Sequence, residues 1–175
     1  MSKTLFHYTQ GYSAVMILRD GMIKRSTGKT PPYVWLSRNP TNEPTACRIP
    51  PEYLPQPIRD SRALFAFQGW ARFVFQGFNA IPWQELPLTD ADRDDLEQTT
   101  KSKGGRPEEW FALEGDVRSV DLPLEIETHL GWRKMAHADL KRQYEDLTTF
   151  DSPDGLLVVL PPHAPLRLRP QTQAK

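Results

Sequence analysis

Residues 5–23 read LFHYTQGYSAVMILRDGMI, and the architecture that we expect for the chain follows from this stretch. Residues 4–8 are mainly apolar and predict a short strand. Ser13 is expected to cap a helix that runs through Asp20, because the apolar residues between them fall on one helical face. Gly21 stands where a helix C-cap favours positive φ, and the apolar pair after it begins the next extended segment. The stretch therefore predicts strand, helix, glycine and strand.

The rest of the chain alternates short strands with few helices. Strands are expected at residues 33–37, in one or two segments of 62–75, at 108–122 and at 155–162, with helices at 89–102 and 137–147. Residues 89–102 begin with a good cap but carry a single large apolar residue, Leu96, so they predict a solvated helix or an ordered loop. The proline-rich residues 39–57 are expected to form an ordered surface loop.

This order of elements predicts an α+β protein with a largely antiparallel, twisted sheet and two or three helices. A chain of 175 residues has the size of one domain, which we expect to span residues 1–168, followed by a flexible tail at 169–175.

Composition excludes several classes of protein. Lys plus Arg and Asp plus Glu both number 22, so no global field attracts nucleic acid or an anionic membrane. Cys47 is the only cysteine, which excludes an intramolecular disulfide and a Cys-rich zinc site. Without a signal peptide or an apolar run near the roughly 20 residues that span a bilayer, we expect a cytoplasmic protein that does not enter a membrane. The four histidines have no metal-ligand spacing.

A polar triplet, His7-Tyr8-Thr9, ends the first predicted strand. In a strand, His7 and Thr9 point to one face and Tyr8 to the other, so an imidazole and a hydroxyl could contact one ligand. Such a pair suits a ribose, whose hydroxyls both donate and accept hydrogen bonds. The alternative is a structural histidine beside a core tyrosine.

The triplet is followed by an Ile-Leu pair, Gly21, Ile23 and the strand VWLS. Over about residues 4–46 this order resembles the opening of the ADP-ribosyltransferase-like superfamily, of the diphtheria-toxin-like and poly(ADP-ribose)-polymerase-like His-Tyr-Glu type. The resemblance implies a split β-sandwich and an enzyme that uses NAD as a substrate, without a metal. It would transfer ADP-ribose to a protein or nucleic-acid acceptor, as toxins, phage proteins and defence effectors of this fold do.

The resemblance also implies roles for the first strand. His7 would bind the adenosine-side ribose of NAD, the backbone at Tyr8 would meet the nicotinamide amide, and Thr9 would support His7.

On the second strand, the resemblance implies that Trp35 or Tyr33 packs against nicotinamide and that Ser37 positions the ring. Cleavage of the glycosidic bond passes through an oxocarbenium-like state, which needs a fixed ring, a stacked aromatic side chain and a carboxylate near the ribose.

The catalytic carboxylate has several candidates. The superfamily places it at the start of a late strand, which favours Glu109, with Glu108 second. Glu43 is a third candidate, because it lies in a proline-fixed loop only six residues beyond Ser37. Further carboxylates stand at Glu114, Glu125 and Glu127. The last two form a Glu-X-Glu motif similar to that of the arginine-modifying branch, but that branch begins with Arg where this chain has His7.

Two alternatives to ADP-ribosyl transfer remain. One is a catalytically inactive binding or inhibitor module with the same fold. The other is an NAD-dependent RNA 2′-phosphotransferase-like enzyme, which the neutral composition does not favour.

Overall fold

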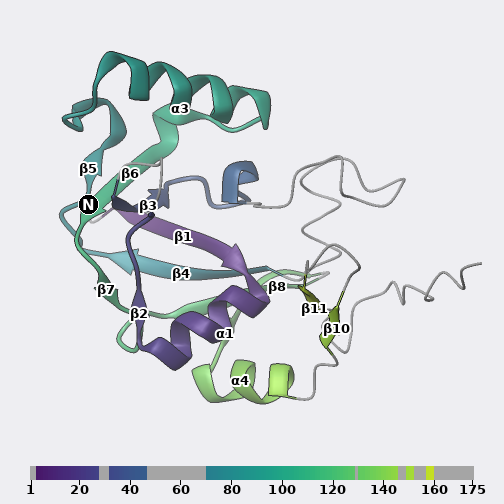
Figure 1. Cartoon of the computed structure of the whole chain (residues 1–175). Coiled ribbons are helices and arrows are strands. Elements are labelled where there is room, and N and C mark those ends of the chain that lie inside the picture. Colours follow the sequence, from purple (N-terminus) through teal and green to yellow (C-terminus); the bar gives the residue numbers. More distant parts are fainter. Residues whose placement is uncertain are drawn as a thin grey trace, which may run out of the picture.

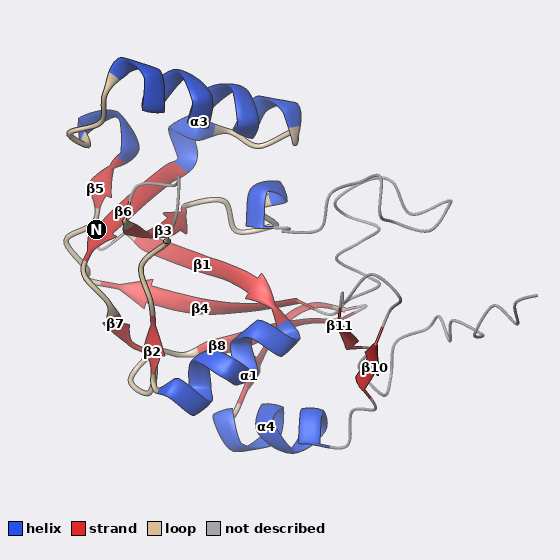
Figure 2. Ribbon diagram, viewed as in Figure 1, coloured by secondary structure: helices blue, strands red, loops and turns tan. Residues whose placement is uncertain are grey.

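A computed structural model of the chain describes residues 3–27, 32–46, 70–128, 130–145, 149–151 and 157–159. Three α-helices and eleven strands lie in this part of the chain (Figures 1 and 2). The helices are α1 (Gly11–Asp20), α3 (Asp90–Ser102) and α4 (His137–Glu145), and the short 3-10 turns are η1 (Pro44–Ala46), η3 (Trp83–Glu85) and η4 (Pro107–Glu109). The strands are β1 (Thr4–Gln10), β2 (Met22–Ile23), β3 (Tyr33–Ser37), β4 (Trp70–Gln76), β5 (Ile81–Pro82), β6 (Trp110–Glu114), β7 (Val117–Arg118), β8 (Leu124–Thr128), β9 (Gly131–Met135), β10 (Thr149–Asp151) and β11 (Leu157–Val159).

Seven strands form one sheet in the order β5-β6-β3-β1-β4-β8-β9, and every pair is antiparallel. Two two-stranded sheets, β2-β7 and β10-β11, are also antiparallel. The prediction of an α+β chain with a largely antiparallel sheet is therefore confirmed.

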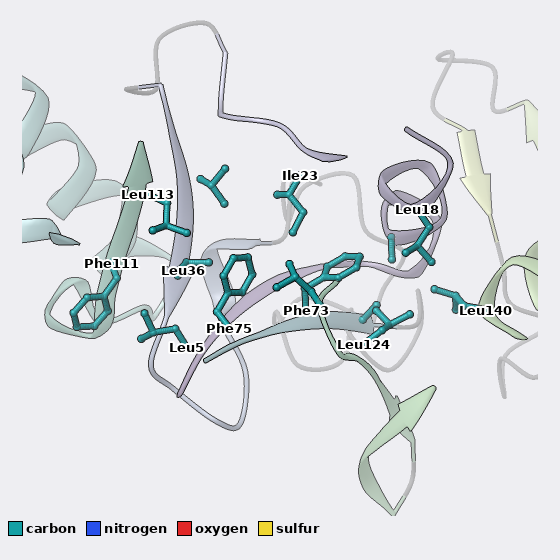
Figure 3. Close-up of a cluster of buried hydrophobic side chains, with 14 residues drawn as sticks. Leu5, Leu18, Ile23, Leu36, Phe73, Phe75, Phe111, Leu113, Leu124 and Leu140 are labelled. Carbon is teal, nitrogen blue, oxygen red and sulfur yellow. The ribbon is translucent and has the colours of Figure 1, made fainter. Parts of the chain in front are cut away.

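One face of the main sheet packs on α1 and α4. Figure 3 shows the cluster, in which Leu18 of α1 and Leu140 of α4 lie beside sheet residues such as Phe73 and Leu124. Phe73 and Phe75 are fully buried. Complete burial of a side chain of this size contributes roughly 1.5–3 kcal/mol, so this face supplies much of the stability.

A second apolar cluster lies on the opposite face, at the end of the sheet near β5 and α3 (Figure 1). Its buried members are Trp83, Leu86, Trp110 and Ala112, and Leu96 of α3 packs against them. Leu96 is the one large apolar residue of its helix, and most of the other α3 side chains are exposed, whereas Thr100 is fully buried.

The helix boundaries test the local predictions. Gly21 has φ 73° and caps α1, as predicted. The cap predicted at Ser13 is wrong: α1 begins at Gly11, with Gln10 as an N-cap whose side chain makes no capping hydrogen bond. Strand β1 passes directly into the helix, so no polar cap separates them. For residues 89–102, the helix alternative is the observed one, and the Thr89 side chain accepts a hydrogen bond from the Asp92 N–H.

The region after α3 departs further from prediction. The strand expected at 108–122 is interrupted, because Gly115 adopts φ 85° between β6 and β7. The β8–β9 hairpin, residues 124–135, was not predicted. Its strands are mostly half-buried or exposed, so their sequence lacks the dense apolar pattern that marks a core strand.

Several predictions fall outside the described residues. These are residues 62–69 of the one or two strands predicted within 62–75, most of the 39–57 loop, residues 146–147 of the predicted 137–147 helix, the ends of the 155–162 strand and the 169–175 tail. The limits of the expected domain stay a prediction. No helix in the described ranges combines the length and the apolar character needed to cross a bilayer.

Candidate active site

The main sheet is split between β1 and β3. Strand β1 pairs with β4 over seven positions, and β3 pairs with β6 over five. In contrast, β1 and β3 pair at the single position Phe6↔Ser37. The sheet is therefore two half-sheets, β5-β6-β3 and β1-β4-β8-β9, whose strands pair with each other at one position only.

A cleft of about 780 Å³ lies at this split. Its walls come from β1, β3, β6, α1, η1 and α3, together with the segment that follows α1. Figure 1 shows how α1 and α3 lie on the two sides of the β1–β3 junction. A volume of this size is in the range of sites for cofactors and other small molecules.

All the residues predicted to bind NAD line this one cleft. They are His7, Tyr8 and Thr9 from β1, and Tyr33, Trp35 and Ser37 from β3. That these residues line the same cleft does not test the role of each one, and the individual roles stay predictions.

His7 connects the two half-sheets. Its Nδ1 lies 3.0 Å from the backbone oxygen of Trp35. Because a carbonyl oxygen only accepts, Nδ1 is the donor in this hydrogen bond. In the neutral ring, Nε2 is then the nitrogen that can accept from a ligand hydroxyl.

Trp35 belongs to an aromatic group at the cleft wall. Its ring centroid is 5.6 Å from that of Trp110 and 5.8 Å from that of Tyr33. The tilted contact with Trp110 and the edge-on contact with Tyr33 hold the orientation of the Trp35 ring while leaving part of the residue exposed. Trp110 also lines the cleft, but the sequence analysis did not single it out, because only the β3–β6 pairing brings it beside Trp35.

Glu43 is the candidate carboxylate that lines the cleft. It is only 7% exposed, and its Oε1 accepts hydrogen bonds from the Thr45 hydroxyl at 2.7 Å and from the Thr45 N–H at 3.3 Å. Within the described ranges, no side chain or N–H group donates a hydrogen bond to Glu43 Oε2. Thr45 lines the cleft too and was missed; a hydroxyl two residues after a loop Glu is too common to have marked it.

The other two candidate carboxylates are not among the residues that line the cleft. Glu109 accepts a hydrogen bond from Asn39 Nδ2 at 3.0 Å and lies 3.6 Å from the Arg106 guanidinium. Glu108 is exposed in η4. Both residues directly precede β6, as predicted for the catalytic carboxylate. However, the Arg38 N–H just after β3 donates to the Glu109 backbone oxygen, so this end of β6 lies beside the loop that follows β3.

Tyr8 links the cleft to a buried ion pair. Its hydroxyl donates to the Asn39 backbone oxygen at 2.6 Å and accepts from Arg72 Nη1 at 3.1 Å. The pKa of Tyr8 is raised to about 12, chiefly by burial and also by the carboxylates of Glu43 and Glu125, while the hydrogen bond and charge of Arg72 oppose the rise. Tyr8 is therefore a neutral hydrogen-bond donor at physiological pH.

Basic side chains also reach the cleft. Lys24, Arg25 and Lys103 are among its lining residues, and all three are exposed. Lys24 pairs with Asp20 at 2.6 Å and Arg25 with Asp116 at 3.3 Å. Within the described ranges, no three His, Cys, Asp or Glu side chains are grouped so that they could hold a metal ion.

Comparisons with protein-family models, curated proteins and solved structures found no match to the chain. The functional assignment therefore depends on the chemistry of the cleft itself.

Proposed function

We propose that the chain is an ADP-ribosyltransferase-like enzyme that cleaves NAD and transfers ADP-ribose to a macromolecular acceptor. The observation that carries this proposal is that His7, Trp35 and Glu43 line one cleft at the split between two half-sheets. An imidazole, a stacking ring and a carboxylate are the groups that nicotinamide–ribose cleavage needs.

In the proposed complex, Trp35 packs against nicotinamide and His7 binds a ribose hydroxyl. Trp35 is suited to this role because Trp110 and Tyr33 hold its ring in place. A ring that is fixed before the ligand binds loses little conformational entropy on binding.

In the proposed reaction, the bond between nicotinamide and ribose C1′ breaks, and its electron pair leaves with nicotinamide. The acceptor nucleophile bonds to C1′ and loses a proton. Glu43 is the carboxylate that we assign to this step, where it holds a hydroxyl of the nicotinamide ribose and stabilises the positive charge that develops on the sugar. Burial strengthens this electrostatic interaction, because Glu43 is shielded from water.

The assignment of Glu43 can be tested against Glu109. Purified wild type and the variants His7→Ala, Glu43→Gln and Glu109→Gln are incubated with NAD, and nicotinamide release is measured. We expect release from the wild type and from Glu109→Gln, and at least a roughly 100-fold loss in Glu43→Gln, the size of effect seen when one electrostatic stabiliser is removed. Gln keeps an acceptor for Thr45 and for Asn39, so both substitutions preserve the local hydrogen bonds.

The reverse result, with activity lost in Glu109→Gln and kept in Glu43→Gln, would transfer the catalytic role to Glu109. If the wild type releases no nicotinamide with any acceptor and NAD does not raise its melting temperature, the proposed function is wrong. An NAD-induced rise in melting temperature without turnover would identify a binding module instead.

A further inference from the structure

The segment between β3 and η1 contacts both half-sheets. Residues 39–41, which we call the strap, leave β3 and lead to Glu43. On the β6 side, the Arg38 N–H donates to the Glu109 backbone oxygen at 2.9 Å, and Asn39 Nδ2 donates to the Glu109 carboxylate. The segment is thus attached to the half-sheet from which it comes.

Three consecutive carbonyl groups attach the strap to the other half-sheet. The Asn39 oxygen accepts from the Tyr8 hydroxyl, the Pro40 oxygen from Arg72 Nη1, and the Thr41 oxygen from Trp132 Nε1 at 2.9 Å. These donors stand on β1, β4 and β9, respectively. A run of loop carbonyls held by side chains from three strands is far more constrained than an ordinary surface loop.

Arg72 is itself held in place by its surroundings. It is 7% exposed, and its Nε and Nη2 lie 2.8 and 2.6 Å from Glu125 Oε2. The guanidinium carbon lies 4.0 Å from the Phe6 ring centroid and 4.2 Å from that of Trp132. The planar cation therefore has few other orientations available, and its direction toward Pro40 is set before any ligand binds.

We propose that Arg72 and Trp132 are positioning residues for Glu43: by holding the strap, they fix this carboxylate in the cleft and set the separation of the two half-sheets at the site. This inference rests on the proposed function, in which Glu43 acts in the transition state. Neither Arg72 nor Trp132 is among the cleft-lining residues. They reach the cleft through the strap and through Tyr8, whose hydroxyl accepts from Arg72 Nη1 and whose ring packs against Trp132.

Trp132→Phe is the sharpest test, because it removes the donor to Thr41 but keeps an aromatic ring over Arg72. We expect kcat for nicotinamide release to fall about tenfold while KM for NAD changes less than about twofold, as for a change that displaces a transition-state group without removing a ground-state contact. The control is Trp83→Phe, the same chemical change at a tryptophan whose Nε1 has no hydrogen-bond partner within the described ranges. Trp83 does not line the cleft, but it is buried in the second apolar cluster with Trp110, so an effect of loosened packing alone would appear in this variant as well.

Amide hydrogen exchange supplies a readout that does not depend on turnover. Residues 43–46 contain the Thr45 and Ala46 N–H groups that donate to Glu43. We expect their exchange to be about fivefold faster in Trp132→Phe, the factor that corresponds to the loss of one net hydrogen bond, and unchanged in Trp83→Phe.

The two proposals can fail separately. If the wild type releases no nicotinamide, the proposed function is wrong, and faster exchange confined to Trp132→Phe would still establish that the strap holds residues 43–46. Equal exchange rates in wild type and Trp132→Phe, or equal acceleration in both tryptophan variants, would overturn the positioning inference. So would an unchanged kcat in Trp132→Phe of an active enzyme.

Discussion

Phe73 and Arg72 are neighbours in β4 and both are buried, but their side chains lie on opposite faces of the sheet. Phe73 is fully buried in the apolar cluster under α1 and α4, where its contribution depends on the area removed from water. Arg72 is buried among Tyr8, Glu125 and the strap, where desolvation opposes its charge and specific partners compensate. One strand therefore stabilises the fold through one face and arranges a site through the other.

The largest loss of stability is expected from the apolar face. Phe73→Ala should lower the free energy of unfolding by about 3–5 kcal/mol, because it removes a fully buried ring and leaves a cavity. Urea denaturation followed by tryptophan fluorescence measures this loss. Val120→Ala is the control, since Val120 is 49% exposed and should change stability by less than about 0.5 kcal/mol. A loss below 1 kcal/mol for Phe73→Ala would contradict the conclusion that the Phe73 face stabilises the fold through the apolar area it buries.

On the face of β4 that carries Arg72, removing one charge of the ion pair should destabilise the protein more than removing both charges. Arg72→Met leaves the carboxylate of Glu125 without its counterion and should cost about 3 kcal/mol. Adding Glu125→Gln should recover at least about 1 kcal/mol, because the uncompensated charge is then gone. The single and double variants form a double-mutant cycle in urea denaturation. Strictly additive losses would contradict the assignment of this pair as a coupled, buried ion pair.

The titration of Tyr8, which contacts Arg72, should make the free energy of unfolding depend on pH. Its pKa in the folded protein is raised to about 12, above the ordinary value of 10.0, so its contribution to stability is complete below about pH 10 and is lost as pH rises toward 12. The free energy of unfolding of the wild type should therefore fall by roughly 2 kcal/mol more than that of Tyr8→Phe over this range. Denaturation at several pH values measures the difference, which cancels groups that titrate in both proteins. Parallel pH profiles would contradict the raised pKa.

The smallest effect on stability is expected from an exposed ion pair on α3, away from both faces of β4. Lys101 and Glu97 are 2.6 Å apart on α3, but their side chains are 65% and 40% exposed. A double-mutant cycle with Lys101→Gln and Glu97→Gln should give a coupling of about 0.3–0.5 kcal/mol, which added salt should weaken. A coupling as large as that of Arg72 and Glu125 would mean that burial does not distinguish the two pairs.

Local sequence patterns predicted the elements best. Gly21 and Thr89 act at the ends of helices, where a positive φ or a hydrogen bond to the backbone is decided within three or four residues. The strand YVWLS was predicted with its observed limits for the same reason, since β-branched and aromatic residues favour extended backbone locally. Ser13 failed as a cap because β1 continues directly into α1, a junction that a capping pattern does not describe.

The candidate site could be predicted only in part. The sequence marked His7, Trp35 and Glu43, and these residues share the cleft. Position in the sequence favoured Glu109, yet in the structure Glu109 anchors Asn39. Glu125 was only one of several late carboxylates in the sequence and was not paired with Arg72, because 53 residues separate these two partners.

The sequence by itself therefore determined the α+β composition, the glycine that ends α1 and the polar triplet at the end of β1. The tertiary structure alone decided that β1 and β3 meet at one position, that a cleft opens beyond it and that Glu43 rather than Glu109 lines this cleft. The physical reason is that helix ends and strand propensities depend on neighbours in the chain, whereas strand pairing and the burial of charges depend on side chains brought together from distant segments.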